Sequence, residues 1–384
     1  MVRFSFSLLM ILLLTSCNTD IKEIQNLNFA TAIGVDFRDD QYHIYVQMEN
    51  FNNVAKTEGG DSSEPQVWVS ETIGETFIAG FFKAYEAGQE RILWAHVNAI
   101  VLSESAIEKG FNNIFDGITR YHEFRLTPWV YGTQLPIEEV LSTVGFYNQT
   151  SLDTVLHNPL RIHEQNSTIR PMQLHKLVRE IFEPSFTTYI PSISIDTEQW
   201  KKSLTPEPKL KIDGAYFIQN SNFKGYFPYE QIKGIRWLTE DTERSFLLIP
   251  KDNDPQFLVA VSRPKPRIEV VSAKELFQFN VSVRAEGVVS NRITNETLPI
   301  TKMEEATNKM IEKEIEQLYK LGVENNIDFL NLEHNIYRNY TRDWKRLDKS
   351  LTLQEDNLTG VTANVKLRHS GAFKNKIIKM EHIE

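Results

Sequence analysis

The chain has 384 residues, of which 41% are hydrophobic and 24% are charged, a balance typical of a folded globular protein. Its formal net charge of −9 argues against a broad nucleic-acid interface, so we expect no nucleic acid among its partners. The length suggests two or three domains, because a domain typically contains about 100–200 residues.

The chain begins with an export signal that ends at a cysteine. Arg3 precedes a short apolar run, "FSFSLLMILLL", which cannot cross a bilayer but is typical of a secretory signal peptide. The last leucine of this run and the three residues after it, "LTSC", resemble a bacterial lipobox, in which the cysteine thiol is diacylated and the chain is cut just before it. We predict a cleaved signal peptide at 1–16, lipid attachment at Cys17 and a lipidated tether at 17–25. An ordinary signal peptide with a chance cysteine is the alternative.

Cys17 is the one cysteine in the sequence. Its acylation would leave the mature protein with no free thiol, no disulfide and no cysteine nucleophile. Two acyl chains bury enough methylene groups to hold a protein stably on a bilayer, whereas a single short chain holds it only marginally. The sequence therefore predicts membrane attachment through a diacylglyceryl anchor and without a spanning helix.

The first structured segment is predicted to be a hairpin. Apolar residues run through 29–36, a turn is expected around 38–40, and apolar residues alternate through 42–48. A short strand is expected at 67–69. Thr72 stands at capping-box spacing from Glu75, which predicts a helix beginning there.

Strands and helices then alternate through the rest of the first half. The run "RILWAHVNAIVLS" favours one central strand, and His96 within it is expected to be a satisfied core group. A helix is predicted over 107–118 and a strand over 127–132. Pro136 and Pro171 each stand where a first helical turn would begin. This order predicts a mixed sheet with interleaved helices, an α+β or α/β layer structure.

The second half shows a different pattern. A charged, proline-bearing stretch at 196–211 suggests a domain boundary, and short aromatic strands follow it. Clean alternation over 277–285 predicts a strand with one buried face, and helical periodicity over 302–321 predicts an amphipathic helix packed on its own sheet. Alternation over 361–367 predicts a closing strand. The C-terminal cations are interpreted as a solvated strand end rather than a lipid-binding patch: Lys366, Arg368, Lys374, Lys376 and Lys379.

The search for catalytic and metal-binding motifs finds weak signals only. His122-Glu123 lacks the second histidine of a zinc protease motif, because position 126 is Leu126. His157 and His163 flank Pro159 and could bind a metal, but a third ligand at a recognised spacing is missing. The acidic pairs are interpreted as solvated charges: Asp39-Asp40, Glu138-Glu139 and Glu304-Glu305. We expect no catalytic residue, no metal and no cofactor.

An ordered set of segments resembles one known family. The opening "KEIQNLNFATAIGVD", the stretches "ETIGETFIAGFFKA" and "RILWAHVNAIVLSESAIEKGFNNIFDGITRYHEFR", then "GAYFIQNSNFKGYF" and "NNIDFLNLEHNIYRNYTRDWK" are similar to the C-subunit lipoproteins of bacterial spore germinant receptors, the Ger(x)C family. The resemblance covers nearly the whole mature chain. Cys17 is the single functional residue that it carries over.

The resemblance implies an α+β fold of three consecutive mixed α/β domains with sheets flanked by helices. We place these at 26–198 (mixed α/β), 199–267 (small and β-rich) and 268–384 (α+β, with a long helix at about 302–322). It also implies a non-enzymatic subunit of a nutrient germinant receptor, needed for assembly or signalling in spore germination. Its partners would be the integral-membrane A and B subunits, on the outer face of the spore inner membrane.

Two other functions remain open from the sequence. A solute-binding lipoprotein of a nutrient importer would have two similar α/β lobes around a hinge, and the halves of this chain differ in pattern. A surface-tethered hydrolase would need a clustered acid/base or metal site, for which His96, His157 and His163 are the candidates.

Overall fold

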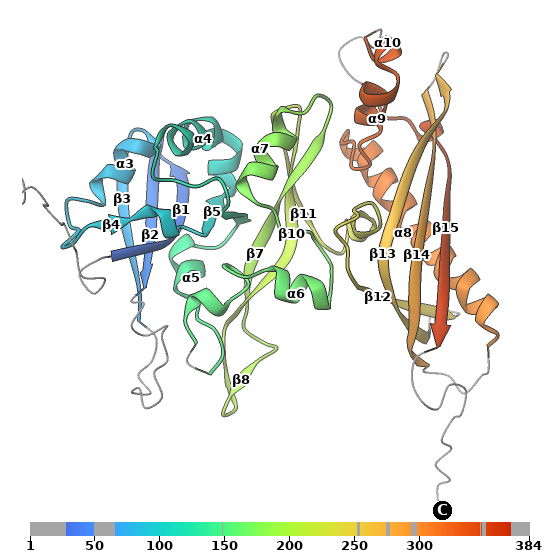
Figure 1. Ribbon diagram of the computed structural model, residues 1–384, viewed down its shortest axis with the longest axis horizontal. Coiled ribbons are helices and arrows are strands. Elements are labelled where there is room, and N and C mark those ends of the chain that lie inside the picture. The colour runs from blue at the N-terminus through green and yellow to red at the C-terminus, as the bar shows by residue number, and fades with distance from the viewer. Residues whose placement is uncertain are drawn as a thin grey trace, which may run out of the picture.

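Two large sheets organise the molecule. The computed structural model describes residues 28–49, 66–147, 149–251, 254–273, 277–292, 298–345, 347 and 351–369. Within these residues the strands form a nine-stranded sheet, a four-stranded sheet and a two-stranded hairpin, and helices pack on both large sheets (Figure 1). The mixed α+β class predicted from the sequence is confirmed.

The nine-stranded sheet has a parallel centre and antiparallel edges. Its order is β11-β10-β7-β6-β5-β1-β2-β3, and β4 pairs with β1. The pairs β1/β5, β5/β6 and β6/β7 are parallel, whereas β1/β2, β2/β3, β7/β10 and β10/β11 are antiparallel. The strands are β1 (Asn28–Arg38), β2 (Gln41–Glu49), β3 (Val67–Gly74), β4 (Ile92–Leu93), β5 (Ala99–Ser103), β6 (Trp129–Thr133), β7 (Thr187–Asp196), β10 (Lys209–Gln219) and β11 (Asn222–Pro228).

The predicted first hairpin is confirmed. Strands β1 and β2 pair from Phe29 opposite Glu49 to Arg38 opposite Gln41. The two turn residues, Asp39 and Asp40, both have positive φ angles, 52° and 56°. Two central residues with positive φ are what a tight type I′ turn requires, and aspartate tolerates this region better than most residues.

Helices cover both faces of this sheet. Buried side chains of α3, α4 and α7 share one apolar cluster, whereas those of α5 belong to a second cluster on the other face. The helices are α3 (Phe77–Lys83), α4 (Phe111–Arg120), α5 (Ile137–Ser142), α6 (Leu160–Gln165) and α7 (Leu174–Phe182), with shorter turns η2 (Trp94–His96), η3 (Ala106–Gly110) and η4 (Ser151–Asp153). The sequence predicts the first turn of α7 at Pro171, but the helix begins three residues later, at Leu174.

The predicted central strand "RILWAHVNAIVLS" is wrong as one unit. It divides into β4, the turn η2 and β5, because Phe29 of β1 pairs with Leu93 while Ala32 pairs with Ala99. The five residues 94–98 therefore lie opposite only two residues of β1, 30 and 31, and they form a bulge between β4 and β5. His96 lies in that bulge and is exposed, with its ring edge-on to Phe29 at 5.1 Å, so the expected core histidine is wrong as well.

The helix predicted to begin at Thr72 begins later. Thr72 lies inside β3, opposite Ile44 of β2, so the ladder extends five residues beyond the predicted strand end. Thr76 caps α3 instead, and its Oγ1 accepts a hydrogen bond from Ala79 N at 3.2 Å. Pairing with β2 outweighs the local capping signal, because β3 gains a backbone partner along its whole length.

The charged stretch at 196–211 links two neighbouring strands of the nine-stranded sheet through a separate short hairpin. The short strands β8 (Lys201–Lys202) and β9 (Thr205–Pro206) pair with each other, and β7 and β10 on either side of them pair from Asp196 opposite Lys209 onward. Strands of the segment 199–267 enter both large sheets, since β10 and β11 join the first and β12 joins the second. The division into three domains stays a prediction.

The four-stranded sheet has the order β12-β13-β14-β15, and one face packs on the long helix α8. The predicted strand at 277–285, helix at 302–322 and strand at 361–367 are confirmed in longer form, and β14 and β15 run parallel. The elements are β12 (Ser245–Lys251), β13 (Asp254–Ala273), β14 (Phe277–Arg292), β15 (Leu358–His369), α8 (Ile300–Asn325), α9 (Leu332–Asn339), α10 (Thr341–Trp344), η5 (Lys233–Trp237) and η6 (Glu355–Asn357).

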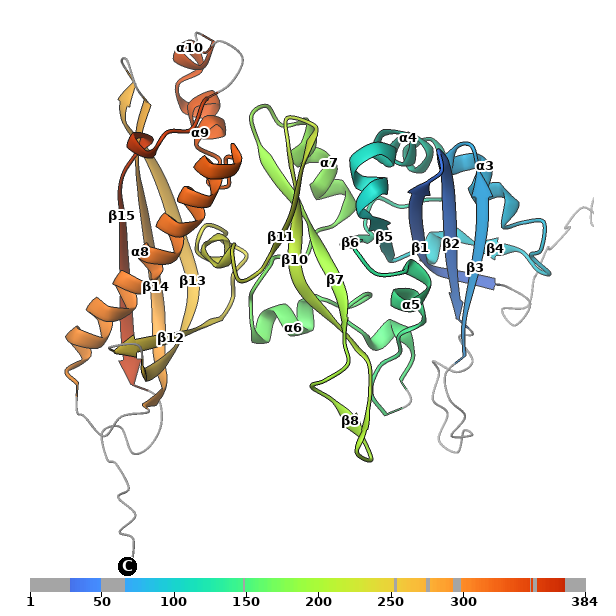
Figure 2. The same cartoon turned by 180° about the vertical axis from the view of Figure 1, so that it is seen from behind.

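The two large sheets share an apolar core. Side chains of β7, β10 and β11 belong to the same buried cluster as those of α8 and β14. Phe329, which follows α8, meets the rings of Phe217 at 4.7 Å and Phe227 at 5.3 Å, both edge-on. In both views α9 lies next to α10, on the side of the second sheet that faces the first (Figures 1 and 2).

Candidate functional site

The residues singled out from the sequence do not form a catalytic site in the described part of the chain. Cys17 lies outside the described residues. His157 does lie beside a serine and a carboxylate, since its Nε2 is 3.5 Å from Ser151 Oγ and Glu49 Oε1 accepts a bond from that hydroxyl. In a catalytic triad the carboxylate binds the second nitrogen of the histidine. Here the carboxylate binds the serine, and His157 Nδ1 has no partner among the described residues.

This cluster is buried, which favours a structural role. His157 Nε2 bonds Gln47 Oε1 at 3.0 Å, and Gln47 Nε2 donates to Ser151 Oγ at 2.9 Å. Burial lowers the pKa of His157 to about 3 and raises the pKa of Glu49. Ser151 is fully buried, so a substrate could not reach its hydroxyl without local unfolding.

His163 is engaged with the backbone. Its Nε2 lies 3.0 Å from Asp241 O, and burial lowers its pKa. No group of three or more histidine, cysteine, aspartate or glutamate residues within the described ranges is placed to hold a metal ion. The acidic pairs Asp39-Asp40 and Glu138-Glu139 are exposed, whereas Glu304 is half-buried and accepts a hydrogen bond from Leu367 N at 2.9 Å.

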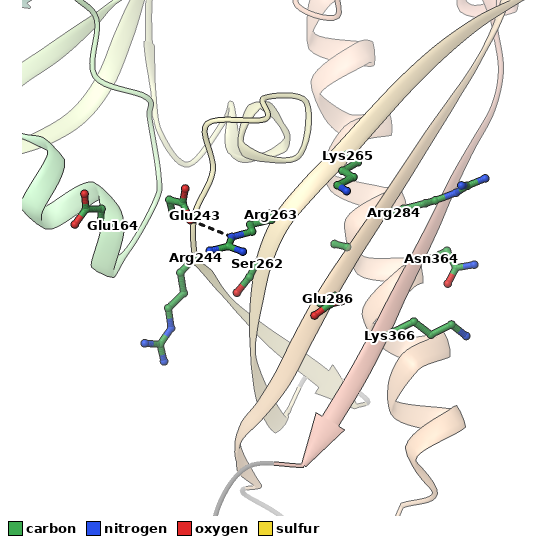
Figure 3. Close-up of a pocket in the computed structure, with 11 residues that line it drawn as sticks. Glu164, Glu243, Arg244, Ser262, Arg263, Lys265, Arg284, Glu286, Asn364 and Lys366 are labelled. Atoms are coloured by element: carbon green, nitrogen blue, oxygen red, sulfur yellow. Dashed lines mark hydrogen bonds and ion pairs between the residues drawn. The ribbon is translucent and has the colours of Figure 1, made fainter.

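A polar cavity of about 1070 Å³ lies against the four-stranded sheet. One wall is the face of β13, β14 and β15 that points away from α8, and the other wall comes from α6 and the segment before β12 (Figure 3). Its lining residues are Glu164, Glu243, Arg244, Ser262, Arg263, Lys265, Arg284, Ala285, Glu286, Asn364 and Lys366.

Strand alternation explains why this face is polar. Val281 and Val283 of β14 are buried in the core shared with α8, so Arg284 and Glu286 point to the opposite face. The closing strand β15 follows the same rule and places Lys366 there. The alternation predicted for 277–285 already placed Arg284 on the polar face, but the sequence did not show what that face would meet.

Hydrogen bonds fix the second wall of the cavity. Ser167, just after α6, donates its N–H to Arg244 O at 2.6 Å, and its Oγ accepts from Glu243 N at 3.1 Å and from Arg244 N at 3.2 Å. Both walls are therefore tied to ordered backbone, and the cavity has a defined shape before any partner arrives.

The cavity carries unbalanced positive charge. Arg263 pairs with Glu243 at 3.4 Å, and Arg368, which is not part of the lining, pairs with Glu286 at 3.6 Å. Lys265, Arg284 and Lys366 make no ion pair with any described residue, although the chain as a whole is acidic. The lining holds no histidine or cysteine. Chemically, such a surface is suited to binding acidic or polar groups.

The comparisons with known proteins identify the class to which this fold belongs. Residues 20–195 match the model of the spore germination protein N-terminal domain, and residues 213–371 match the model described as spore germination B3/GerAC like, C-terminal. The chain belongs to the GerAC-type family of spore germination proteins, as the sequence resemblance predicted.

Individual relatives agree with this assignment. Spore germination protein KC of Bacillus subtilis (strain 168) is 24% identical and aligns over 96% of each chain. The putative spore germination protein YfkR of the same organism is 22% identical over 80% of each chain. The crystal structure of the GerBC protein has a TM-score of 0.54 at 14% identity and covers 91% of this chain and 100% of that one, so the two share a fold.

No helix in the described ranges is both long enough and apolar enough to span a bilayer.

Proposed function

We propose that this protein is the lipid-anchored C subunit of a nutrient germinant receptor, without catalytic activity, on the outer face of the spore inner membrane. The observation that carries the proposal is the match of two germination-family models to most of the chain. The sequence "LTSC" supports the anchor at Cys17. Integral-membrane A and B subunits are the proposed partners.

The polar cavity is the proposed docking surface for an acidic segment of one of these subunits. Lys265, Arg284 and Lys366 present charges that no described residue neutralises, on a sheet face that α8 leaves uncovered. Complementary charge across an interface mainly sets its specificity and its association rate. The other wall, formed by α6 and the segment before β12, faces these charges across the cavity.

An importer's solute-binding protein fits the architecture less well. That class has two similar α/β lobes around a hinge, whereas here a nine-stranded sheet with a parallel centre stands beside a four-stranded sheet with one long helix. The alternative from the sequence therefore gains no support from the fold.

The anchor is tested with Cys17→Ala, using Ser16→Ala as the matched control because it keeps a small residue in the lipobox. We expect mass spectrometry to find a diacylglyceryl group on Cys17 in the wild type and in the control. The Cys17→Ala variant protein should be absent from the spore membrane fraction and should no longer co-purify with multi-span subunits. An unacylated wild-type protein, or a membrane fraction that yields no multi-span partner, would contradict the proposal.

A further inference from the structure

One exposed hairpin combines apolar, aromatic and basic side chains. The β8–β9 hairpin projects beyond the body of the molecule in both views (Figures 1 and 2). Trp200 and Leu204 belong to this hairpin, and the loop after α5 places Phe146 and Tyr147 beside it. The rings of Phe146 and Trp200 lie 4.8 Å apart, edge to face. We call these four residues, with Lys201 and Lys202, the hairpin tip.

The apolar side chains of the hairpin tip face solvent to an unusual degree. Tyr147 is 92% exposed, Leu204 is 90% exposed and Trp200 is 46% exposed. Single exposed apolar residues are normal, but here the Phe146 ring contacts both Trp200 and Tyr147, and contiguous exposed apolar groups of this kind mark interaction surfaces. They contribute little to the stability of the free protein, because they are not removed from water.

Several residues of the hairpin tip also have a strained backbone conformation. Ser203 and Leu204 form the turn with φ angles of 50° and 73°, and Tyr147 has a φ of 54°. Bulky residues are disfavoured in the left-handed region, where glycine or asparagine would be easier to accommodate. A non-glycine residue in this conformation costs about 1–3 kcal/mol, and such strained positions cluster at binding and other functional sites.

The tip is nevertheless ordered. Lys201 pairs with Pro206 and Lys202 with Thr205, and Glu207 N donates to Trp200 O at 2.8 Å. The loop that carries Phe146 is tied to β10, since Lys209 Nζ donates to Gly145 O at 3.2 Å and lies over the Phe146 ring at 5.0 Å. Glu207 also pairs with Lys209 at 3.0 Å, which neutralises the carboxylate at the base of the hairpin.

We propose that the hairpin tip inserts into the interfacial region of a phospholipid bilayer. Tryptophan and tyrosine favour the headgroup level of membranes, and lysine stems lie along apolar surface while their ammonium groups reach phosphates. The projecting, convex shape suits a bilayer surface better than a protein groove. Paired backbone groups in the hairpin lower the cost of leaving water.

This inference rests on the proposed membrane anchoring, which would hold the tip near lipid. Asn28, the first described residue, stands eleven positions after Cys17. An extended chain spans at most about 3.6 Å per residue, so the anchor leaves the body within roughly 40 Å of the membrane surface. The hairpin tip would then provide a second contact that fixes the orientation of the body.

The test uses a fluorescent label at the tip. Leu204→Cys adds one reactive thiol, because the native Cys17 is acylated in the anchored protein. The purified full chain is labelled with a polarity-sensitive fluorophore, reconstituted into phosphatidylethanolamine–phosphatidylglycerol vesicles, and floated on a density gradient. Phe182→Cys is the matched control, since Phe182 is apolar and 68% exposed but lies beyond the opposite end of β7.

We expect the label at 204 to brighten several-fold and shift to the blue on vesicles, and to be quenched by lipids that carry a shallow spin label. The label at 182 should show the same emission on vesicles as it does on the free protein in water. A protein that floats while the label at 204 stays aqueous would overturn the hairpin inference and leave the anchor intact. A protein that does not float would contradict both proposals.

Discussion

The buried carboxylate of Glu314 holds η5 against the long helix α8. Arg236 Nη2 donates to both of its oxygens at 2.9 Å, and Trp237 Nε1 donates to Oε2 at 2.6 Å. Arg236 also donates to Tyr229 Oη at 2.7 Å and to Phe246 O at 3.3 Å. A buried charge pair contributes little net stability compared with apolar residues, but losing one partner leaves an unpaired charge in the core.

Removing that partner should be strongly destabilising. We expect Glu314→Ala to lower the free energy of unfolding by about 3–5 kcal/mol, because the Arg236 guanidinium stays buried without a counter-charge. Urea denaturation followed by tryptophan fluorescence measures the change. Glu316→Ala, on the exposed side of the same helix, should change it by less than about 0.5 kcal/mol. Equal losses in the two variants would show that the ion pair has no special role.

His157 should make the protein sensitive to mild acid. Its pKa falls from 6.5 in the unfolded chain to about 3 in the folded protein, because it is buried as the neutral ring. Between these values the unfolded state binds more protons, so stability declines as the pH falls below 6.5. From pH 7 to pH 5 this group should remove about 2 kcal/mol of the free energy of unfolding.

The comparison with His157→Gln isolates that contribution. Glutamine can still donate to Gln47 Oε1 but does not titrate, and the neighbouring Glu49 is present in both proteins. We expect urea denaturation at pH 7 and pH 5 to show a wild-type loss that exceeds the loss of the variant by about 2 kcal/mol. Parallel pH profiles would mean that His157 binds protons equally in the folded and unfolded states, which would contradict the prediction.

At the scale of elements, α8 protects the free edge of a sheet. Strand β15 pairs with β14 on one side and forms the end of the four-stranded order on the other. Three α8 side chains spaced four residues apart accept hydrogen bonds from that free edge. Glu304 accepts from Leu367 N at 2.9 Å, Asn308 from Val365 N at 2.8 Å, and Glu312 from Ala363 N at 2.9 Å. Unpaired edge amides are sites for aggregation, and here side chains replace the missing strand.

The protection can be measured at a single amide. We expect Asn308→Ala to speed hydrogen exchange at Val365 N by about tenfold, since a lost hydrogen bond costs roughly 1–1.5 kcal/mol of local stability. Nuclear magnetic resonance or peptide-level mass spectrometry detects this. Lys309→Ala, one residue further on and exposed, should leave Val365 unchanged. Unaltered exchange in Asn308→Ala would mean that water satisfies this edge equally well.

The sequence predictions are correct where neighbouring residues determine the structure, and they fail where pairing with a distant strand determines it. The strand at 277–285 and the helix at 302–322 are correct because each has one apolar face, and that periodicity is written in neighbouring residues. The strand expected at 91–103 fails because its division depends on the register with β1, about sixty residues earlier. Thr72 fails as a cap because pairing with β2 extends β3.

The polar cavity could not be predicted from the sequence, because its lining residues come from distant parts of the chain. Its lining comes from α6, the segment before β12, and three strands of the second sheet. The alternation of β14 predicted which residues leave the core, but their neighbours across the cavity come from distant parts of the chain: Arg244 stands 40 positions before Arg284, and Glu164 stands 120 positions before it. The Lys366 and Arg368 cations do lie on a solvated strand, as expected, whereas Lys374, Lys376 and Lys379 lie outside the described residues.

At the scale of the whole molecule, polar side chains connect the two sheets. Asn331 accepts from Thr187 N at 2.6 Å and donates back to Thr187 O at 3.2 Å. Glu333 accepts from Ser185 Oγ at 2.7 Å. These bonds lie beside the shared aromatic core, so directional contacts fix the angle between sheets that apolar packing alone would leave loosely defined. The cavity, with one wall on each side of this joint, therefore keeps its shape.

A cavity of fixed shape with unpaired cations makes a sharp prediction about assembly. If an acidic segment of a partner subunit docks there, reversing two charges should weaken the complex through repulsion without unfolding the protein. We expect the double variant Arg284→Glu, Lys366→Glu to retain about a tenth of the wild-type yield of co-purified A and B subunits from spore membranes, a loss of about 1.4 kcal/mol. Both side chains are exposed, so the free energy of unfolding should fall by less than about 1 kcal/mol, chiefly from repulsion between the residue 366 carboxylate and Glu286 opposite it.

The matched control reverses charges of the same kind on the face that α8 presents to water. Lys313 and Lys320 are exposed on that helix and lie outside the cavity lining, so Lys313→Glu, Lys320→Glu changes the net charge equally. Specific docking at the cavity predicts normal co-purification for this control. Losses of equal size in both double variants would mean that net charge governs assembly. Full assembly of the cavity variant would move the docking surface elsewhere, while Cys17 and the membrane anchor would be unaffected.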